Sequence, residues 1–252
     1  MEDLMEAEFN GTFITLGGFV EMDKYRYLYF VILLTIYIII LCTNCTIICL
    51  IWIHRDLHEP MYIFIAALSL NSLLFSTAIY PKLFIDILSH KQTISYSACL
   101  FQYLLYYSFA VSDFLLLSAM AYDRYVSICK PLHYPTIMGK RTVIVLLTLA
   151  WFLSTCEVAV ATVISSQKKL CDLTTKGIFC NNTIFKLHCV KSSFLNAYGL
   201  FVLMNLVVVP LMFILFTYIK IFIVTYHSCV EVRKKAAETC LPHLMVLLLH
   251  WL

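Results

Sequence analysis

Long apolar runs with few charges constrain this chain more than any other feature of its sequence. A helix that crosses the hydrocarbon core of a bilayer needs about 20 consecutive apolar residues. Five segments reach this length, at residues 26–53, 60–81, 99–124, 142–164 and 194–222. Across the whole chain 62% of residues are hydrophobic and 13% are charged, whereas a soluble domain carries about 25% charged residues. The sequence therefore predicts an all-α fold, a single polytopic bundle of membrane helices.

The final apolar stretch is too short to cross a bilayer. Residues 241–252 read LPHLMVLLLHWL, and a helix of this length rises only about 18 Å against about 30 Å of hydrocarbon. We expect a partial sixth helix over residues 235–252 and a chain that is truncated within it. Because such a bundle would expose an unpaired groove, we also expect poor export and retention in the endoplasmic reticulum.

Charge and motif content exclude several classes of function. The formal net charge of +3 is small and scattered, so nucleic acid is not an expected partner. The sequence has no nucleophile beside a general base, no phosphate-binding glycine loop and no metal-binding motif. We therefore expect no enzyme activity, no cofactor and no metal. A transporter is the weaker alternative, because it would show paired interrupted helices and charges along a midplane path, which this sequence lacks.

Glycosylation sequons indicate the orientation of the chain in the membrane. The positive-inside rule does not decide the orientation, because Lys and Arg are divided evenly between the two faces. Asn10 and Asn181 each begin an Asn-x-Thr sequon, and glycans are added only on the outer or lumenal side. Alternating spans place the tail at residues 1–25 and the loop at residues 168–193 on the same face. The amino terminus is therefore expected to be extracellular.

Four cysteines fall near this outer face, where thiols oxidise: Cys99, Cys171, Cys180 and Cys189. Four cysteines allow three pairings, and a bridge from the loop to Cys99 would clamp the loop to the third helix. A zinc site that includes His188 is the rival interpretation.

The stretch MAYDRYVSICKPLHYP, residues 120–135, closes the third helix and brings an acid, a base and an aromatic together at Asp123, Arg124 and Tyr125. A buried arginine must be paired. We interpret the pair as a two-state switch in which the carboxylate holds the guanidinium at rest and releases it when the helices separate. The alternative is an arginine that only anchors the helix at the membrane interface.

Asp113 is the only charged residue deep within the third helix. A carboxyl group at this depth of a membrane helix indicates a functional site by default. It could contribute to an ion site or form a neutral polar core with Asn71 or Ser72 of the second helix. One carboxylate with neutral oxygen ligands is a poor cation cage, which favours the polar core. Glu157 of the fourth helix is assigned no role.

Aromatic and aliphatic residues in the outer half of the third helix suggest where a small apolar ligand would bind. Helically spaced positions there that could face such a site are Tyr103, Tyr106, Tyr107, Ala110 and Val111. Ordinary packing against neighbouring helices or lipid is the alternative for each of them.

Several motifs in order along the chain together resemble the odorant receptors of the rhodopsin-like G protein-coupled class. They are PMYIF at 60–64, the stretch at 120–135, TY at 217–218, KAAETCLPHL at 235–244, Trp151 in the fourth helix and Pro210 in the fifth. This resemblance implies a seven-transmembrane receptor of which five full helices and part of the sixth are present. It also implies disulfides between Cys99 and Cys180 and between Cys171 and Cys189.

The same resemblance implies a function and the sites for it. A small volatile or water-borne odorant, mostly apolar, would bind between the helices near the residues above and near Val202, Leu203 and Leu206. Tyr218 would stabilise the open state, and a heterotrimeric G protein of the stimulatory, olfactory type would raise cyclic AMP at the plasma membrane. Besides membrane lipids no other partner is implied. The alternative is a truncated, non-signalling fragment or pseudogene product.

Overall fold

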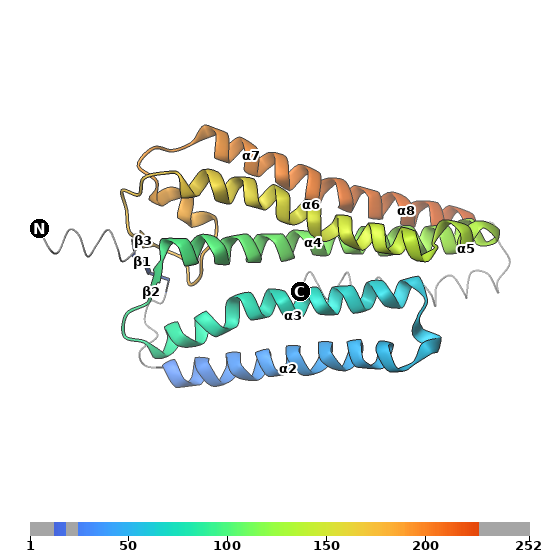
Figure 1. The fold of residues 1–252 in the computed structure, drawn as a ribbon, viewed down its shortest axis with the longest axis horizontal. Coiled ribbons are helices and arrows are strands. Elements are labelled where there is room, and N and C mark those ends of the chain that lie inside the picture. Colours follow the sequence, from blue (N-terminus) through green and yellow to red (C-terminus); the bar gives the residue numbers. More distant parts are fainter. Residues whose placement is uncertain (1–12, 19–24, 227–252) are drawn as a thin grey trace, which may run out of the picture. The chain divides into compact units, whose positions relative to one another are not determined.

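The computed structural model describes residues 13–18 and 25–226. Within them, five helical spans are long and apolar enough to cross a membrane. Figure 1 draws the helices that form these spans. They are α2 (Arg26–Ile53), α3 (Pro60–Leu88), α4 (Tyr96–Cys129), α6 (Lys140–Ser166), and a fifth span built from α7 (Ser193–Leu203), η5 (Met204–Val208) and α8 (Val209–Tyr226). The prediction of five membrane helices is confirmed. The partial sixth helix, the KAAETCLPHL motif and Asn10 lie outside the described residues.

Helix α3 continues beyond the apolar run that indicated it. Its interior contains Pro81, which lacks the backbone donor of a helical hydrogen bond, and it extends to Leu88. The extension carries an ion pair between Lys82 and Asp86, and residues four apart on a helix lie on the same face. A search for uncharged runs stops at such residues, although paired charges support the helix.

The fifth span changes its helical geometry part-way along. Between α7 and α8, η5 is a π-helical turn, a local widening of the helix that occurs often at functional sites. Pro210 follows at the second position of α8 and is buried.

Three short strands form a small sheet that the sequence did not predict. β1 (Phe13–Leu16) is the central strand; it pairs antiparallel with β2 (Thr93–Ser95) and parallel with β3 (Thr174–Thr175). Alternate side chains of a strand point to opposite faces, and accordingly Ile14 and Leu16 are buried while Phe13 is exposed. The remaining short elements are η2 (Arg55–Leu57), η3 (Pro131–His133), α5 (Tyr134–Ile137) and η4 (Asn182–Leu187).

The chain divides into two compact units, and α3, α4 and α6 contribute residues to both. The first unit comprises Met1–Cys45, Ser72–Ala110 and Thr155–Leu200, and the second comprises Thr46–Asn71, Val111–Ser154 and Phe201–Leu252.

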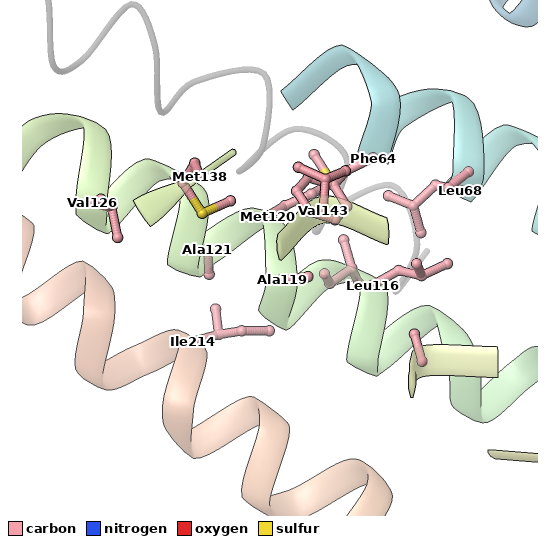
Figure 2. Packing of buried hydrophobic residues seen from close by; sticks show 13 residues of the cluster. Phe64, Leu68, Leu116, Ala119, Met120, Ala121, Val126, Met138, Val143 and Ile214 are labelled. Carbon is pink, nitrogen blue, oxygen red and sulfur yellow. The ribbon is translucent and has the colours of Figure 1, made fainter. Parts of the chain in front are cut away.

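Each unit has its own apolar core. In the first, Ile14 and Leu16 of β1 pack with residues of α4, α6 and η4, including Val158 and Leu187. In the second, Phe64 and other residues of α3 pack with a stripe of α4 and with Ile214 of α8, as Figure 2 shows. The stripe includes small residues at Ala119 and Ala121, which allow close approach of helices in a membrane.

Candidate functional site

Asp123 and Arg124, near the end of α4, form a buried ion pair in the second unit. Asp123 is fully buried and Arg124 is 6% exposed. The Arg124 Nε donates to Asp123 Oδ2 at 3.0 Å, and Nη2 donates to the same oxygen. The guanidinium is therefore held by its neighbour in sequence rather than extended toward solvent.

Tyr134, the first residue of α5, completes this arrangement. Its hydroxyl donates to Asp123 Oδ1 at 2.8 Å, so that each oxygen of the Asp123 carboxylate accepts a hydrogen bond. Burial, followed by the negative charge of Asp123, raises the pKa of the Tyr134 hydroxyl. The hydroxyl keeps its proton at neutral pH and remains a donor to the carboxylate.

The two tyrosines predicted to act with this pair, Tyr125 and Tyr218, both pack against the core of the second unit as partly buried residues. Tyr218 follows Thr217, whose hydroxyl donates to the carbonyl oxygen of Ile214 at 2.7 Å. The side chain of Ile214 is part of that core, so the two tyrosines and the Ile214 turn of α8 share one packing cluster.

Asp113 lies in a second polar group of the same unit. The Asn71 Nδ2 donates to Asp113 Oδ1 at 2.7 Å. The Asn71 Oδ1 in turn accepts from Ser112 Oγ at 2.8 Å and from Trp151 Nε1 at 3.0 Å. Because both ends of the Asn71 amide are used by protein groups, its oxygen would have to lose a donor in order to bind a cation.

This geometry corresponds to the polar core and pairs Asp113 with Asn71. The other predicted partner, Ser72, contributes its carbonyl oxygen to the hydroxyl of Ser76 at 2.8 Å.

The three tyrosines predicted to contact a ligand belong to one aromatic cluster in the first unit. The ring centroids of Tyr103 and Tyr107 are 4.6 Å apart, and those of Tyr106 and Tyr107 are 4.8 Å apart. Two phenylalanines that follow β3 in the chain join the cluster. The ring centroid of Phe179 lies 4.9 Å from that of Tyr106, and the centroid of Phe185 lies 5.3 Å from that of Tyr103. These spacings are typical of favourable aromatic pairs.

The other predicted ligand positions differ from one another in their burial and in the unit to which they belong. Ala110 is half-buried in the first unit, whereas Val111 and Leu206 are buried in the second. Val202 is half-buried and Leu203 is 48% exposed, and both also belong to the second unit.

Two disulfides fix the loop that follows α6. Cys99 is bonded to Cys180, and Cys171 is bonded to Cys189. These bonds leave none of the four sulfurs as a thiolate for the zinc alternative. Among residues 13–18 and 25–226, no group of three or more His, Cys, Asp or Glu side chains is arranged to hold a metal ion.

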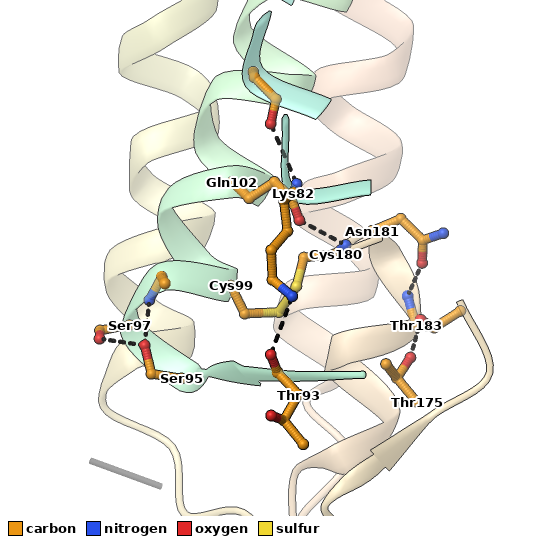
Figure 3. The surroundings of a disulfide bond; sticks show 12 residues. Lys82, Thr93, Ser95, Ser97, Cys99, Gln102, Thr175, Cys180, Asn181 and Thr183 are labelled. Carbon is orange, nitrogen blue, oxygen red and sulfur yellow. Dashed lines mark hydrogen bonds between the residues drawn. A yellow bond between two sulfur atoms is a disulfide. The ribbon is translucent and has the colours of Figure 1, made fainter. Parts of the chain in front are cut away.

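Gln102 reinforces the first disulfide, as Figure 3 shows. Its Nε2 donates to the carbonyl oxygen of Ala78, and its Oε1 accepts from the backbone N–H of Cys180, both at 3.2 Å. Nearby, Asn181 Oδ1 accepts from the backbone N–H of Thr183 at 2.9 Å and caps η4.

His188 is the histidine of the zinc alternative, and its Nε2 lies 3.1 Å from the Tyr96 hydroxyl oxygen. The Tyr96 hydroxyl donates to the carbonyl oxygen of Ser165 at 2.7 Å, so His188 must supply the proton of the bond that it forms with Tyr96. Burial, and then the charge of Lys168, lowers the pKa of His188.

Comparison with known proteins decides the family. The family model described as olfactory receptor matches residues 33–252. The chain belongs to the olfactory receptor family. Human Olfactory receptor 10J4 is 35% identical over 246 residues, which cover 95% of this chain and 78% of that protein. Human Olfactory receptor 1N2 is 36% identical over 93% of this chain and 75% of its own length, and rat Olfactory receptor 1496 is 32% identical over 96% and 80%. The protein is thus a multi-pass membrane receptor of the G protein-coupled class and not an enzyme.

Three residues of this olfactory receptor were missed by reasoning from the sequence. Tyr134 lies within the quoted stretch at 120–135, where an aromatic hydroxyl at the start of a short helix was a detectable signal. Trp151 was noted only as a motif residue, although a buried indole N–H needs an acceptor. Ser112 directly precedes Asp113 and carried no pattern that would have singled it out.

Proposed function

We propose that this olfactory receptor binds small, mostly apolar odorants between its helices and activates a heterotrimeric G protein of the stimulatory, olfactory type, which raises cyclic AMP. The observation that carries the coupling half of this proposal is the buried Asp123–Arg124 pair with Tyr134. Removing one member of a buried ion pair is costly because the other charge is left uncompensated. The pair can therefore oppose a change that separates its members until a partner offers the guanidinium new contacts.

In the resting state Asp123 holds Arg124, and Tyr134 holds Asp123. Rearrangement of α4 relative to α8 releases the guanidinium, which then binds the terminal helix of the G protein. Tyr125 and Tyr218 share the packing cluster of these helices, and in the active state Tyr218 contacts the released Arg124. The packed core favours two discrete arrangements over continuous deformation.

For the odorant we propose the aromatic cluster of Tyr103, Tyr106 and Tyr107. Aromatic walls with a few hydroxyl groups suit small apolar molecules that form one directional hydrogen bond. Ala110 of the same unit extends this set, and Val111, Val202, Leu203 and Leu206 of the second unit are proposed as ligand positions in their own right. The disulfide between Cys99 and Cys180 supports this assignment, because it ties the segment that carries Phe179 to the start of α4.

We further propose that the receptor acts at the plasma membrane with its amino terminus outside. The disulfides and the Asn181 sequon lie in the first unit, in agreement with an oxidising, glycosylating side. Asn10 and Asn181 are the proposed glycan acceptors.

The test is odorant-evoked cyclic AMP in cells that express the chain, with surface labelling to normalise the signal. A second arm extends the chain with the carboxy-terminal part of Olfactory receptor 10J4, of which the chain covers 78%. Arg124→Ala should abolish the response without reducing surface labelling by a similar factor. Arg141→Ala removes an exposed arginine at the start of α6 and should leave the response intact.

Different outcomes contradict different parts of the proposal. A receptor that reaches the surface and stays silent to broad odorant panels in both arms contradicts odorant signalling. A response that survives Arg124→Ala contradicts the assigned switch. A response in the extended arm alone supports the non-signalling alternative for the chain by itself.

A further inference from the structure

The Asn181 sequon forms part of the folded structure of the loop after α6. Asn181 Oδ1 accepts from the backbone N–H of Thr183 at 2.9 Å, and the Asn181 carbonyl oxygen accepts from the backbone N–H of Ile184 at 3.0 Å. The Thr183 hydroxyl forms a hydrogen bond with the hydroxyl of Thr175 in β3, and Ile184 is fully buried. The closed loop therefore already uses both groups that define an Asn-x-Thr acceptor, the asparagine amide and the threonine hydroxyl.

The residues on either side of Asn181 are tied to α4. Cys180 precedes Asn181 and is bonded to Cys99, as Figure 3 shows. Asn182 follows Asn181 and donates its backbone N–H to the Tyr107 hydroxyl at 3.4 Å. The hydrogen bond opens by local fluctuation, whereas the disulfide opens only by exchange with another thiol. The disulfide is therefore the link that decides how long the sequon stays free of α4.

Transfer of a glycan requires the sequon to leave this arrangement. The Asn181 amide nitrogen attacks the anomeric carbon of a lipid-linked oligosaccharide diphosphate and gives a proton to a base of the transferase. A C–N bond forms, the C–O bond to the diphosphate breaks, and the lipid diphosphate leaves. The transferase has to bind the side chains of Asn181 and Thr183 in its own site, but in the closed loop both side chains bond to the loop itself. The folded loop is therefore a poor acceptor.

The disulfide and the glycan become possible at the same stage of synthesis. Cys99 lies 81 residues before Cys180, so the bond has to wait for Cys180, and Asn181 is the next residue to be made. Closure passes two electrons and two protons from the thiols to a lumenal disulfide oxidant, which becomes a dithiol. Synthesis at about 5–20 residues per second and disulfide formation within seconds or longer place the two reactions in the same interval.

We propose that closure of the Cys99–Cys180 disulfide competes with glycosylation of Asn181, so that the receptor is made in two forms, with and without a glycan at this residue. This inference rests on the proposed function, because it concerns the regulation of one of the proposed glycan acceptors. A loop that closes first leaves Asn181 bare, and faster oxidation leaves more molecules bare. The redox state of the lumen thereby sets the proportion of the two forms.

The test measures the fraction of Asn181 that carries a glycan in newly made chains. Peptides that contain the sequons are analysed by mass spectrometry after enzymatic deglycosylation, which converts a glycosylated asparagine to aspartate. Cys99→Ser prevents the bond, leaves residues 180–183 unchanged and should raise the fraction at least about twofold, because oxidation that takes seconds or longer no longer closes the loop. Cys156→Ser removes a cysteine of α6 that forms neither disulfide and should leave the fraction unchanged.

A reductant provides a second measurement that needs no substitution. Dithiothreitol added to the cells during synthesis should raise the glycosylated fraction of Asn181 in the wild type and should add nothing in Cys99→Ser. A further rise in Cys99→Ser would assign the competition to the Cys171–Cys189 bond and overturn the role of Cys99. Because each fraction is a ratio within one population of chains, it does not depend on the folding or export of the variant.

The sequon at Asn10 separates failure of this inference from failure of the proposed function. A fraction at Asn181 that is the same with and without the bond, while Asn10 is glycosylated, overturns the competition and leaves the extracellular orientation intact. An equal rise at Asn10 in Cys99→Ser also overturns it, because the effect is then general to glycan transfer. A chain that carries a glycan at neither asparagine in any sample contradicts the proposed orientation itself.

Discussion

Removal of the Tyr134 hydroxyl should raise the basal activity of the receptor. Tyr134→Phe deletes the donor that lies 2.8 Å from Asp123 Oδ1 and leaves the ring in place. Among the described residues, the buried carboxylate then keeps the bonds from Arg124 alone. Because one of its oxygens loses its partner, the resting arrangement is weakened more than an active arrangement in which the ion pair is already open.

The size of the effect follows from the kind of bond that is lost. A hydrogen bond to a charged group contributes about 1.5–3 kcal/mol, and the half-buried position of Tyr134 favours the lower value. About 1.4 kcal/mol is a factor of ten in an equilibrium. A receptor with about 1% of its molecules active at rest would then have about 10% active.

The assay is cyclic AMP without added odorant, divided by surface-labelled receptor, in cells that express each variant. Tyr62→Phe removes a hydroxyl from the first turn of α3 and serves as the matched control. Equal basal signals from wild type and Tyr134→Phe at equal surface levels would refute the assignment of Tyr134 to the resting state.

Three further predictions concern the stability of the purified receptor, measured as the midpoint of thermal unfolding. The lowered pKa of His188 means that the folded state resists protonation of this side chain. The stability should therefore be full above about pH 6.5, the pKa of histidine in the unfolded chain, and should fall as the pH decreases below that value. His188→Asn should flatten this pH dependence, and a pH profile that the substitution leaves unchanged would contradict the role of His188. Asn71→Ala deprives Ser112 and Trp151 of their acceptor and should cost about 1–3 kcal/mol, whereas Asn205→Ala, at an exposed site in η5, should cost less. Cys180→Ser should lower the midpoint by an amount that corresponds to about 2–5 kcal/mol, and a midpoint insensitive to both this change and reductant would contradict a structural role for the bridge.

The membrane helices could be predicted from the sequence because each depends only on a local run of apolar residues. The same reasoning singled out Asp123 and Arg124 as candidates, since adjacent charges at the end of such a run are unusual. It did not find the bond from Tyr134, because the return of the chain through η3 and α5 is set by tertiary packing.

The small sheet was missed for a related reason. The strand residues at 13–16 form a short alternating pattern, and its partners are far away in sequence. Pairing of this kind is not encoded in any single window of the chain. By contrast, the sequence limited the partner of Asp113 on the neighbouring helix to two adjacent residues, Asn71 and Ser72. In the structure the hydrogen bond to Asp113 comes from Asn71.

The central position of β1 also sets an order for the biosynthesis of the receptor. Thr15 lies opposite Thr93 on one side and Thr174 on the other, so the strand cannot complete its hydrogen bonds until β3 has been synthesised. At about 5–20 residues per second this delay lasts on the order of 10–30 s. The strand β1 is therefore completed late although it is made early, and during that interval its unpaired edges are exposed to chaperones and to modifying enzymes.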